Sequence, residues 1–199
     1  MSHFLVVGED ELCCELGLKI ASSVLKGWTS AAYPVSTGGI TKLIPRLPSF
    51  VEQAEYVQPV ICIADTDGTC PVNMVQVLNS PNLSPSFVLR LAHSEAESWV
   101  LADRYGFSSK FGVPAGKVPH VPDSIADPKR LVLTLASRSR YRWVRDELVS
   151  ASDVSKRGSG YNMHLSSFVR SLWDVEVARG FSESLNRACI AIAKIADNA

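Results

Sequence analysis

The sequence predicts an α/β protein in which helices flank a parallel β-sheet and a helical extension follows at the C-terminus. Short apolar segments alternate with amphipathic ones from residue 3 to residue 105, the pattern of a sheet with helices on both faces. The run at 60–64 is apolar and rich in β-branched residues, as in a buried parallel strand. Near residue 106 the composition changes from strand-forming to helical. We therefore divide the chain into an α/β core, 1–105, and a helical extension packed on it, 106–199.

The first half of the chain supplies the elements of the core. Residues 3–7 form the first expected strand, and apolar residues then recur every four positions from Leu12 to Val24, which indicates a helix. Gly27 is a suitable end for that helix. Further strands are expected over 29–33, 60–64 and 87–91, and helices over 49–56, 71–79 and 95–105, the last with Ser94 as its N-cap.

The second half is expected to be helical after a connecting loop. Four prolines in 106–128 predict irregular backbone there. A basic loop at 156–160, Lys-Arg-Gly-Ser-Gly, lies between the later helices. The helices themselves are expected over 129–137, 141–150, 162–172 and 182–195.

Composition excludes some classes of function. The 199 residues include 20 basic and 20 acidic side chains, so the chain lacks the bulk positive charge of an autonomous nucleic-acid binder, although a local basic patch is not excluded. No stretch of apolar residues is long enough to span a membrane, and the N-terminus becomes acidic too soon for a signal peptide. The five cysteines lack metal-finger spacing. We expect reduced, mostly buried thiols in a cytoplasmic protein.

Acidic residues follow three of the expected strands. Asp65 and Asp67 come directly after the central strand, 9–11 follow the first, and Glu95 and Glu97 follow the last. The carboxyl ends of parallel strands share one edge of a sheet, where ligands bind in open α/β folds. Oxygen ligands suit Mg²⁺ or Mn²⁺, and a pair of such ions can support phosphodiester cleavage. Turn chemistry at 65–68 and helix-dipole stabilisation at 9–11 are the alternative explanations.

Six segments together resemble the TOPRIM domain of topoisomerases, primases and overcoming-lysogenization-defect nucleases. More narrowly, the chain resembles a family of small bacterial TOPRIM-like proteins that are often encoded beside an ATPase in presumed phage-defence operons. The order and spacing of the segments carry the resemblance, which covers nearly the whole chain. They are VVGEDE at 6–11, ADTDG at 64–68, HSEAESWVLAD at 93–103, PD with DPK at 122–129, GSGYN at 158–162 and SLNRA at 184–188.

The resemblance implies a magnesium or manganese site. It assigns Glu11, Asp65 and Asp67 as metal ligands and Glu97 as a further acid of the catalytic site. The family usually has Glu-Gly at the end of its first strand, where this chain has Val7-Gly8. The absence of that glutamate leaves a one-metal or degenerate site open as an alternative to a two-metal site, and Glu9 stands close enough in sequence to substitute.

Basic residues of the helical extension are candidates for holding substrate. Arg138 and Arg142 belong to a group of four arginines within eight residues, and Lys156 lies in the basic loop. These side chains can bind phosphates, or they can form a solvated helix face. Arg187 can reach toward the carboxylates or pair with Glu183 one turn earlier.

These features support three functional hypotheses. The first is a metal-dependent nuclease subunit that acts on DNA or RNA with an ATPase partner. The second is a catalytically degenerate TOPRIM-like module that binds or regulates a partner. The third is a small nucleotide-binding α/β protein that uses the same sheet edge. The sequence leaves the oligomeric state open.

Overall fold

The β-sheet is parallel throughout. The computed structural model describes residues 2–66 and 84–197, and the strands run in the order β2-β1-β4-β5, with β3 also paired to β1. Every pairing is parallel, which confirms the α/β prediction. The strands are β1 (His3–Gly8), β2 (Thr29–Ser30), β3 (Val35–Ser36), β4 (Val60–Asp65) and β5 (Phe87–Ala92).

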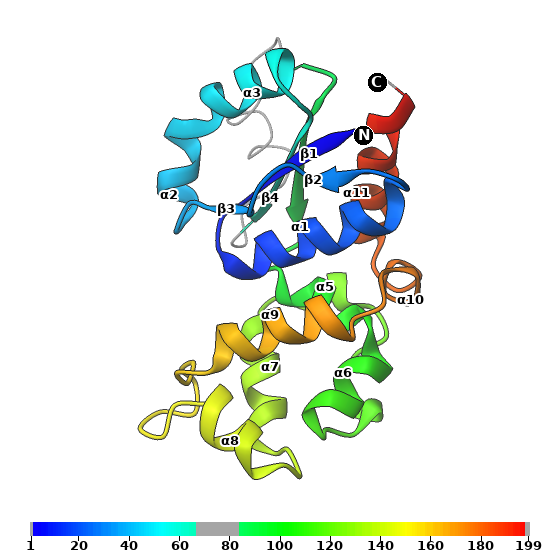
Figure 1. Cartoon of the computed structure of the whole chain (residues 1–199). Coiled ribbons are helices and arrows are strands. Elements are labelled where there is room, and N and C mark those ends of the chain that lie inside the picture. The colour runs from blue at the N-terminus through cyan, green and yellow to red at the C-terminus, as the bar shows by residue number, and fades with distance from the viewer. Residues whose placement is uncertain (1, 67–83, 198–199) are drawn as a thin grey trace.

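Helices cover both faces of the sheet, and further helices form a separate group next to it. In Figure 1, α1, α2, α3 and α11 surround the sheet, and α5 to α9 form the other half of the molecule. The expected helix over 71–79 lies outside the described residues. The helices are α1 (Glu11–Val24), α2 (Ile40–Leu43), α3 (Leu47–Tyr56), α5 (Glu97–Ala102), α6 (Arg104–Phe111), α7 (Pro128–Ser137), α8 (Arg142–Leu148), α9 (Tyr161–Ser171), α10 (Val175–Arg179) and α11 (Glu183–Ala193), with 3₁₀ turns over Ile44–Arg46, Ala115–Lys117, Pro122–Ser124 and Lys194–Asp197.

Strand alternation distributes the apolar side chains between two cores. In β4, Ile61 and Ile63 face the core formed with α1 and α11, whereas Cys62 and Ala64 face the smaller core formed with α2 and α3. Successive side chains of a strand point to opposite faces, so a strand that is apolar at every position serves both cores. The uninterrupted run at 60–64 is therefore explained by burial on both sides.

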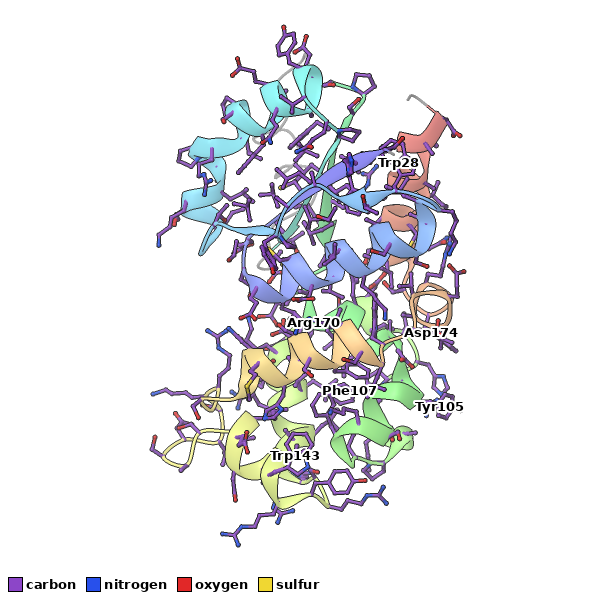
Figure 2. The ribbon with its side chains drawn as sticks, viewed as in Figure 1. Trp28, Tyr105, Phe107, Trp143, Arg170 and Asp174 are labelled. Atoms are coloured by element: carbon purple, nitrogen blue, oxygen red, sulfur yellow. The ribbon has the colours of Figure 1, made fainter. Side chains whose placement is uncertain are left out.

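The helical half shares its core with the sheet. One continuous cluster of buried side chains extends from Phe4 of β1 to Phe107 and Phe168 in the helical half. Phe107, Phe111 and Phe168 pack ring against ring, with centroids 4.7 to 6.2 Å apart. Figure 2 shows Phe107 inside the helical half and Arg170 where α9 approaches α1. The chain then returns to the sheet, because α11 packs against β5 and α1.

The expected helix over 95–105 is wrong in its extent. It divides at Asp103 into α5 and α6, because Asp103 leaves the helical conformation at φ −81° and ψ 71°. The Asp103 carboxylate accepts hydrogen bonds from the Gly106 backbone N–H at 2.9 Å and from the Asp174 N–H at 3.1 Å. An aspartate that caps a new helix and binds a distant backbone group favours this break over continuous helix.

Two other local expectations are corrected. Ser94 is not an N-cap: its φ is 61°, and its N–H donates to Thr66 Oγ1 at 2.9 Å. The segment 106–128 contains the greater part of α6 and two 3₁₀ turns, so it is less irregular than its prolines suggest. Within the described residues, the structure contains no helix with the length and apolar content needed to cross a membrane.

Candidate functional site

Asp65 lies at the carboxyl end of β4, buried against the following segments of the chain. Its side chain points to the same face as Ile61 and Ile63, because these positions are two residues apart. The Oδ1 atom accepts hydrogen bonds from the Ala96 backbone N–H at 2.8 Å and from the Cys13 thiol at 3.7 Å. Asp65 thereby joins α1 to the segment that opens α5, and only 8% of its surface remains exposed.

The environment of Asp65 disfavours its ionised form. Burial is the main cause, and the negative charges of Glu97, Glu9 and Asp10 add to it, raising the pKa of Asp65 from 3.8 to about 8. The positive charge of Lys129 acts in the opposite direction. A further positive charge next to Asp65 would therefore stabilise its ionised form.

Glu97, in the first turn of α5, is the second buried acid of this edge. Only 3% of its surface is exposed, and its Oε1 accepts a hydrogen bond of 2.9 Å from the Tyr161 hydroxyl. Burial raises the pKa of Glu97, although the charge of Lys129 and the bond from Tyr161 oppose that shift. Tyr161 itself is buried at the start of α9, and the pKa of its hydroxyl is raised well above the ordinary value by burial and by Glu97.

Lys129, near the start of α7, is a cation whose charge acts on both of these acids. Its ammonium lies 2.8 Å from Glu95 Oε1, while Glu95 Oε2 accepts from the Lys129 backbone N–H at 2.7 Å. Burial alone would lower the pKa of Lys129, but the carboxylates of Glu97, Glu95 and Asp65 outweigh it and the pKa is raised. Lys129 therefore stays charged and partly neutralises the acids.

Glu9 is the residue that brings the end of β1 into the site. Its Oε2 accepts from the Asp65 backbone N–H at 3.1 Å, and its Oε1 accepts from the Ile40 N–H at 3.2 Å. The Glu9 side chain thus lies between the ends of β1 and β4 and the start of α2. Val7, at the position where the family usually carries glutamate, is fully buried in the smaller core.

The expected metal ligands converge only in part. Glu11 is exposed at the first position of α1, where its charge acts on Arg170 of α9, and it does not join the group around Asp65. Asp67 lies outside the described residues. Among residues 2–66 and 84–197, no three Asp, Glu, His or Cys side chains lie where they could hold one metal ion. The donor chemistry suits a hard cation, but the described donors are too few.

The expected substrate-binding cations are dispersed over the helical half. Arg142 pairs with Asp146 one turn later at 3.1 Å, and Arg187 pairs with Glu183, as the alternative explanation for it expected. Arg138 is exposed at the end of α7. Lys156 is exposed beside Asp153 at 3.5 Å and lines a cavity that Lys129 also lines. Of the four, Lys156 shares a cavity with Lys129 and Glu95, and Arg187 shares another with His93, the residue after β5.

Sequence reasoning did not identify Lys129 and Tyr161 as residues of the site. Both fall within the segments that carry the TOPRIM-like resemblance, DPK at 127–129 and GSGYN at 158–162, and this was the available signal. Other such segments also meet: Asp123 accepts from the Ser184 N–H at 2.8 Å, and the Trp99 indole donates to Ser184 Oγ at 2.8 Å. In comparisons with known proteins, no family model, curated protein or solved structure matches the chain.

Proposed function

We propose that the protein is a metal-dependent nuclease subunit whose acidic site lies at the carboxyl edge of the parallel sheet. The observation that carries the proposal is the gathering of Glu9, Asp65 and Glu97 there from three separate strand ends. Asp65 and Glu97 are buried, which raises the pKa of both, and the charge of Glu97 raises the pKa of Asp65 further. Such a group is costly to maintain unless a cation or bound protons offset it, so a catalytic role accounts for it better than a structural one.

The proposal gives each described residue a role. Asp65 and Glu9, with Asp67 next to them in sequence, are the proposed oxygen ligands of Mg²⁺ or Mn²⁺, and Glu11 remains a ligand by resemblance only. The ion would activate water and stabilise the leaving oxygen of a phosphodiester. Glu97, held by Tyr161, would orient the site, and Lys129 would attract the substrate phosphate. The substrate is DNA or RNA and the partner an ATPase, both on the resemblance.

A cleavage assay tests the proposal. Purified protein is incubated with plasmid DNA and with RNA in Mn²⁺, alone and with the product of the neighbouring ATPase gene. We expect cleavage by the wild type and its loss in Asp65→Asn, which keeps the shape and the hydrogen-bond acceptor of Asp65. Lys26→Gln, an exposed change in the turn after α1, is the control for handling and contamination. Equal cleavage by the wild type and Asp65→Asn would reject the proposal.

The position of Lys129 favours a second candidate, the degenerate binding or regulatory module. Its ammonium already supplies positive charge to Glu95, Glu97 and Asp65, a role that a metal ion fills in an active site. In this case the wild type does not cleave under any of the conditions, and calorimetric titration with Mn²⁺ gives no heat of binding. Cleavage that depends on Asp65 rejects this candidate.

A further inference from the structure

The helical half contains a basic cavity beside the acidic site. The cavity has a volume of about 450 Å³ and lies between α7 and the loop that precedes α9. Cationic side chains dominate its wall, with two carboxylates as the opposing charges. The residues concerned are Lys129, Arg130, Lys156 and Arg157, with Glu95 and Asp127. The lining holds four cations and two carboxylates, and Asp153 pairs with Lys156 from outside it, so one net positive charge remains and the cavity suits an anion.

Two of these cations retain charge that the protein does not pair. Within the described part of the chain, neither Arg130 nor Arg157 forms an ion pair. The Arg157 guanidinium lies 5.9 Å from the centre of the Tyr161 ring and donates to Asn162 Oδ1 at 3.4 Å. These contacts orient the guanidinium without neutralising it. A planar, permanently charged group of this kind can bind phosphate oxygens in a bidentate manner.

The backbone holds Lys156 and Arg157 at the cavity. Val149 and Arg157 form an antiparallel bridge, and the Ser150 N–H donates to the Lys156 carbonyl at 2.9 Å. At Gly158, a Cβ atom would come within 2.3 Å of the Glu147 carbonyl oxygen. The glycine is therefore required for close packing against the end of α8. Lys156 and Arg157 therefore lie on a loop whose two sides are joined by backbone hydrogen bonds.

Two residues of the cavity, Lys129 and Arg157, connect it to the acidic site. Lys129 lines the cavity, and its charge acts on Glu97 and Asp65. Arg157 lies over the ring of Tyr161, whose hydroxyl binds Glu97. A phosphoryl group bound by Arg130 and Arg157 would therefore lie in the cavity that Lys129 also lines, next to the acidic site.

We infer that this cavity binds a phosphoryl group of the substrate, an inference that rests on the proposed function for the identity of that substrate. The cations that hold it are Arg130 and Arg157, supported by Lys156 and Lys129. The phosphoryl group belongs to the backbone of a single-stranded nucleic acid, because the basic wall is short and the rest of the chain has no excess positive charge. Free nucleotides and inorganic phosphate share this chemistry and are the competing sources.

Binding in a chelating buffer tests the inference apart from catalysis. The probes are a fluorescein-labelled single-stranded DNA and the same sequence as RNA, followed by fluorescence anisotropy in EDTA. We expect Arg130→Gln and Arg157→Gln each to weaken binding about tenfold and to reduce the salt dependence by about one counterion. Arg46→Gln is the matched control, because Arg46 is also exposed and lies 5.1 Å from an aromatic ring, that of Phe50. Circular dichroism checks that all three variants are folded.

Each result either identifies the source of the bound phosphoryl group or rejects the cavity as its binding site. Binding of the oligonucleotides that depends on Arg130 and Arg157 supports the inference, whether or not the protein cleaves in Mn²⁺. If only a nucleoside monophosphate or inorganic phosphate binds, with the same dependence, the cavity stands and the nucleic-acid source is rejected. Absence of binding by every probe, or equal binding by the variants and Arg46→Gln, would overturn the inference. Cleavage lost in Asp65→Asn with unchanged binding separates the two proposals.

Discussion

The hydroxyl of Tyr161 donates a hydrogen bond of 2.9 Å to Glu97, and both side chains are buried. The two residues are 64 positions apart, so this contact fixes the start of α9 against the first turn of α5. It also supplies a donor to a carboxylate that burial has removed from water. The contact therefore connects the stability of the helical half to the geometry of the acidic site.

Tyr161→Phe should destabilise the protein. Glu97 loses a hydrogen-bond donor while it stays buried, and this costs about 1–3 kcal/mol of the free energy of unfolding. The pKa of Glu97 should rise further, because Tyr161 lowers it in the wild type. Urea unfolding at pH 7 measures the effect, with Tyr105→Phe as the control because Tyr105 is 65% exposed. The same loss in both variants would contradict the assigned role of Tyr161.

Lys129→Met should destabilise the protein more at pH 8 than at pH 5. Removing the ammonium leaves Glu95, Glu97 and Asp65 without the positive charge of Lys129, at a cost of about 1–3 kcal/mol for a half-buried group. The pKa values of Asp65 and Glu97 are raised, so more of these two carboxyls are protonated at pH 5 and the cost should be smaller. Denaturant unfolding at the two pH values gives the comparison, with Lys26→Met as an exposed control. A loss that is independent of pH would indicate that Lys129 acts through packing alone.

The titration of Asp65 should make a metal-free protein less stable as the pH rises. Its pKa is about 8 in the folded protein against 3.8 ordinarily, so between these values the folded state keeps a proton that the unfolded state releases. The contribution of Asp65 to the free energy of unfolding is therefore greatest below about pH 4 and falls until about pH 8, by a few kcal/mol. We expect Asp65→Asn to remove this fall. The measurement is the difference between the two unfolding curves across pH in EDTA, and a constant difference would contradict the raised pKa.

Gly8→Ala should be strongly destabilising. A Cβ atom at position 8 would lie 2.6 Å from the Cys14 backbone nitrogen and 2.8 Å from the Asp10 carbonyl oxygen. Backbone atoms cannot move aside without shifting α1, so we expect a loss of about 2 kcal/mol or more. Gly116→Ala, where the added atom meets nothing within 4 Å, should change stability by less than about 0.5 kcal/mol. Thermal unfolding of the two variants tests the contrast, and similar melting temperatures would refute it.

The sequence by itself determined the three longer strands of the sheet and the first helix, whereas β3 was not predicted and the strand expected over 29–33 is limited to β2. Apolar periodicity placed β1, β4, β5 and α1 correctly, because burial on one or both faces of an element dictates its pattern over a few neighbouring residues. The same local reasoning failed at Ser94. The Ala96 N–H that opens this turn is bound by Asp65, which is 31 residues away.

Only the tertiary structure decided which charged residues meet. Lys129 and Tyr161 join the acids of the sheet edge, Glu9 lies beside Asp65, and Glu11 faces α9 instead. Glu9 precedes the helix and Glu11 is its first residue, and side chains two positions apart there point in different directions, so one belongs to the site and the other is exposed. Electrostatic partners are selected by distance in space, and the sequence order of the charges does not contain that distance.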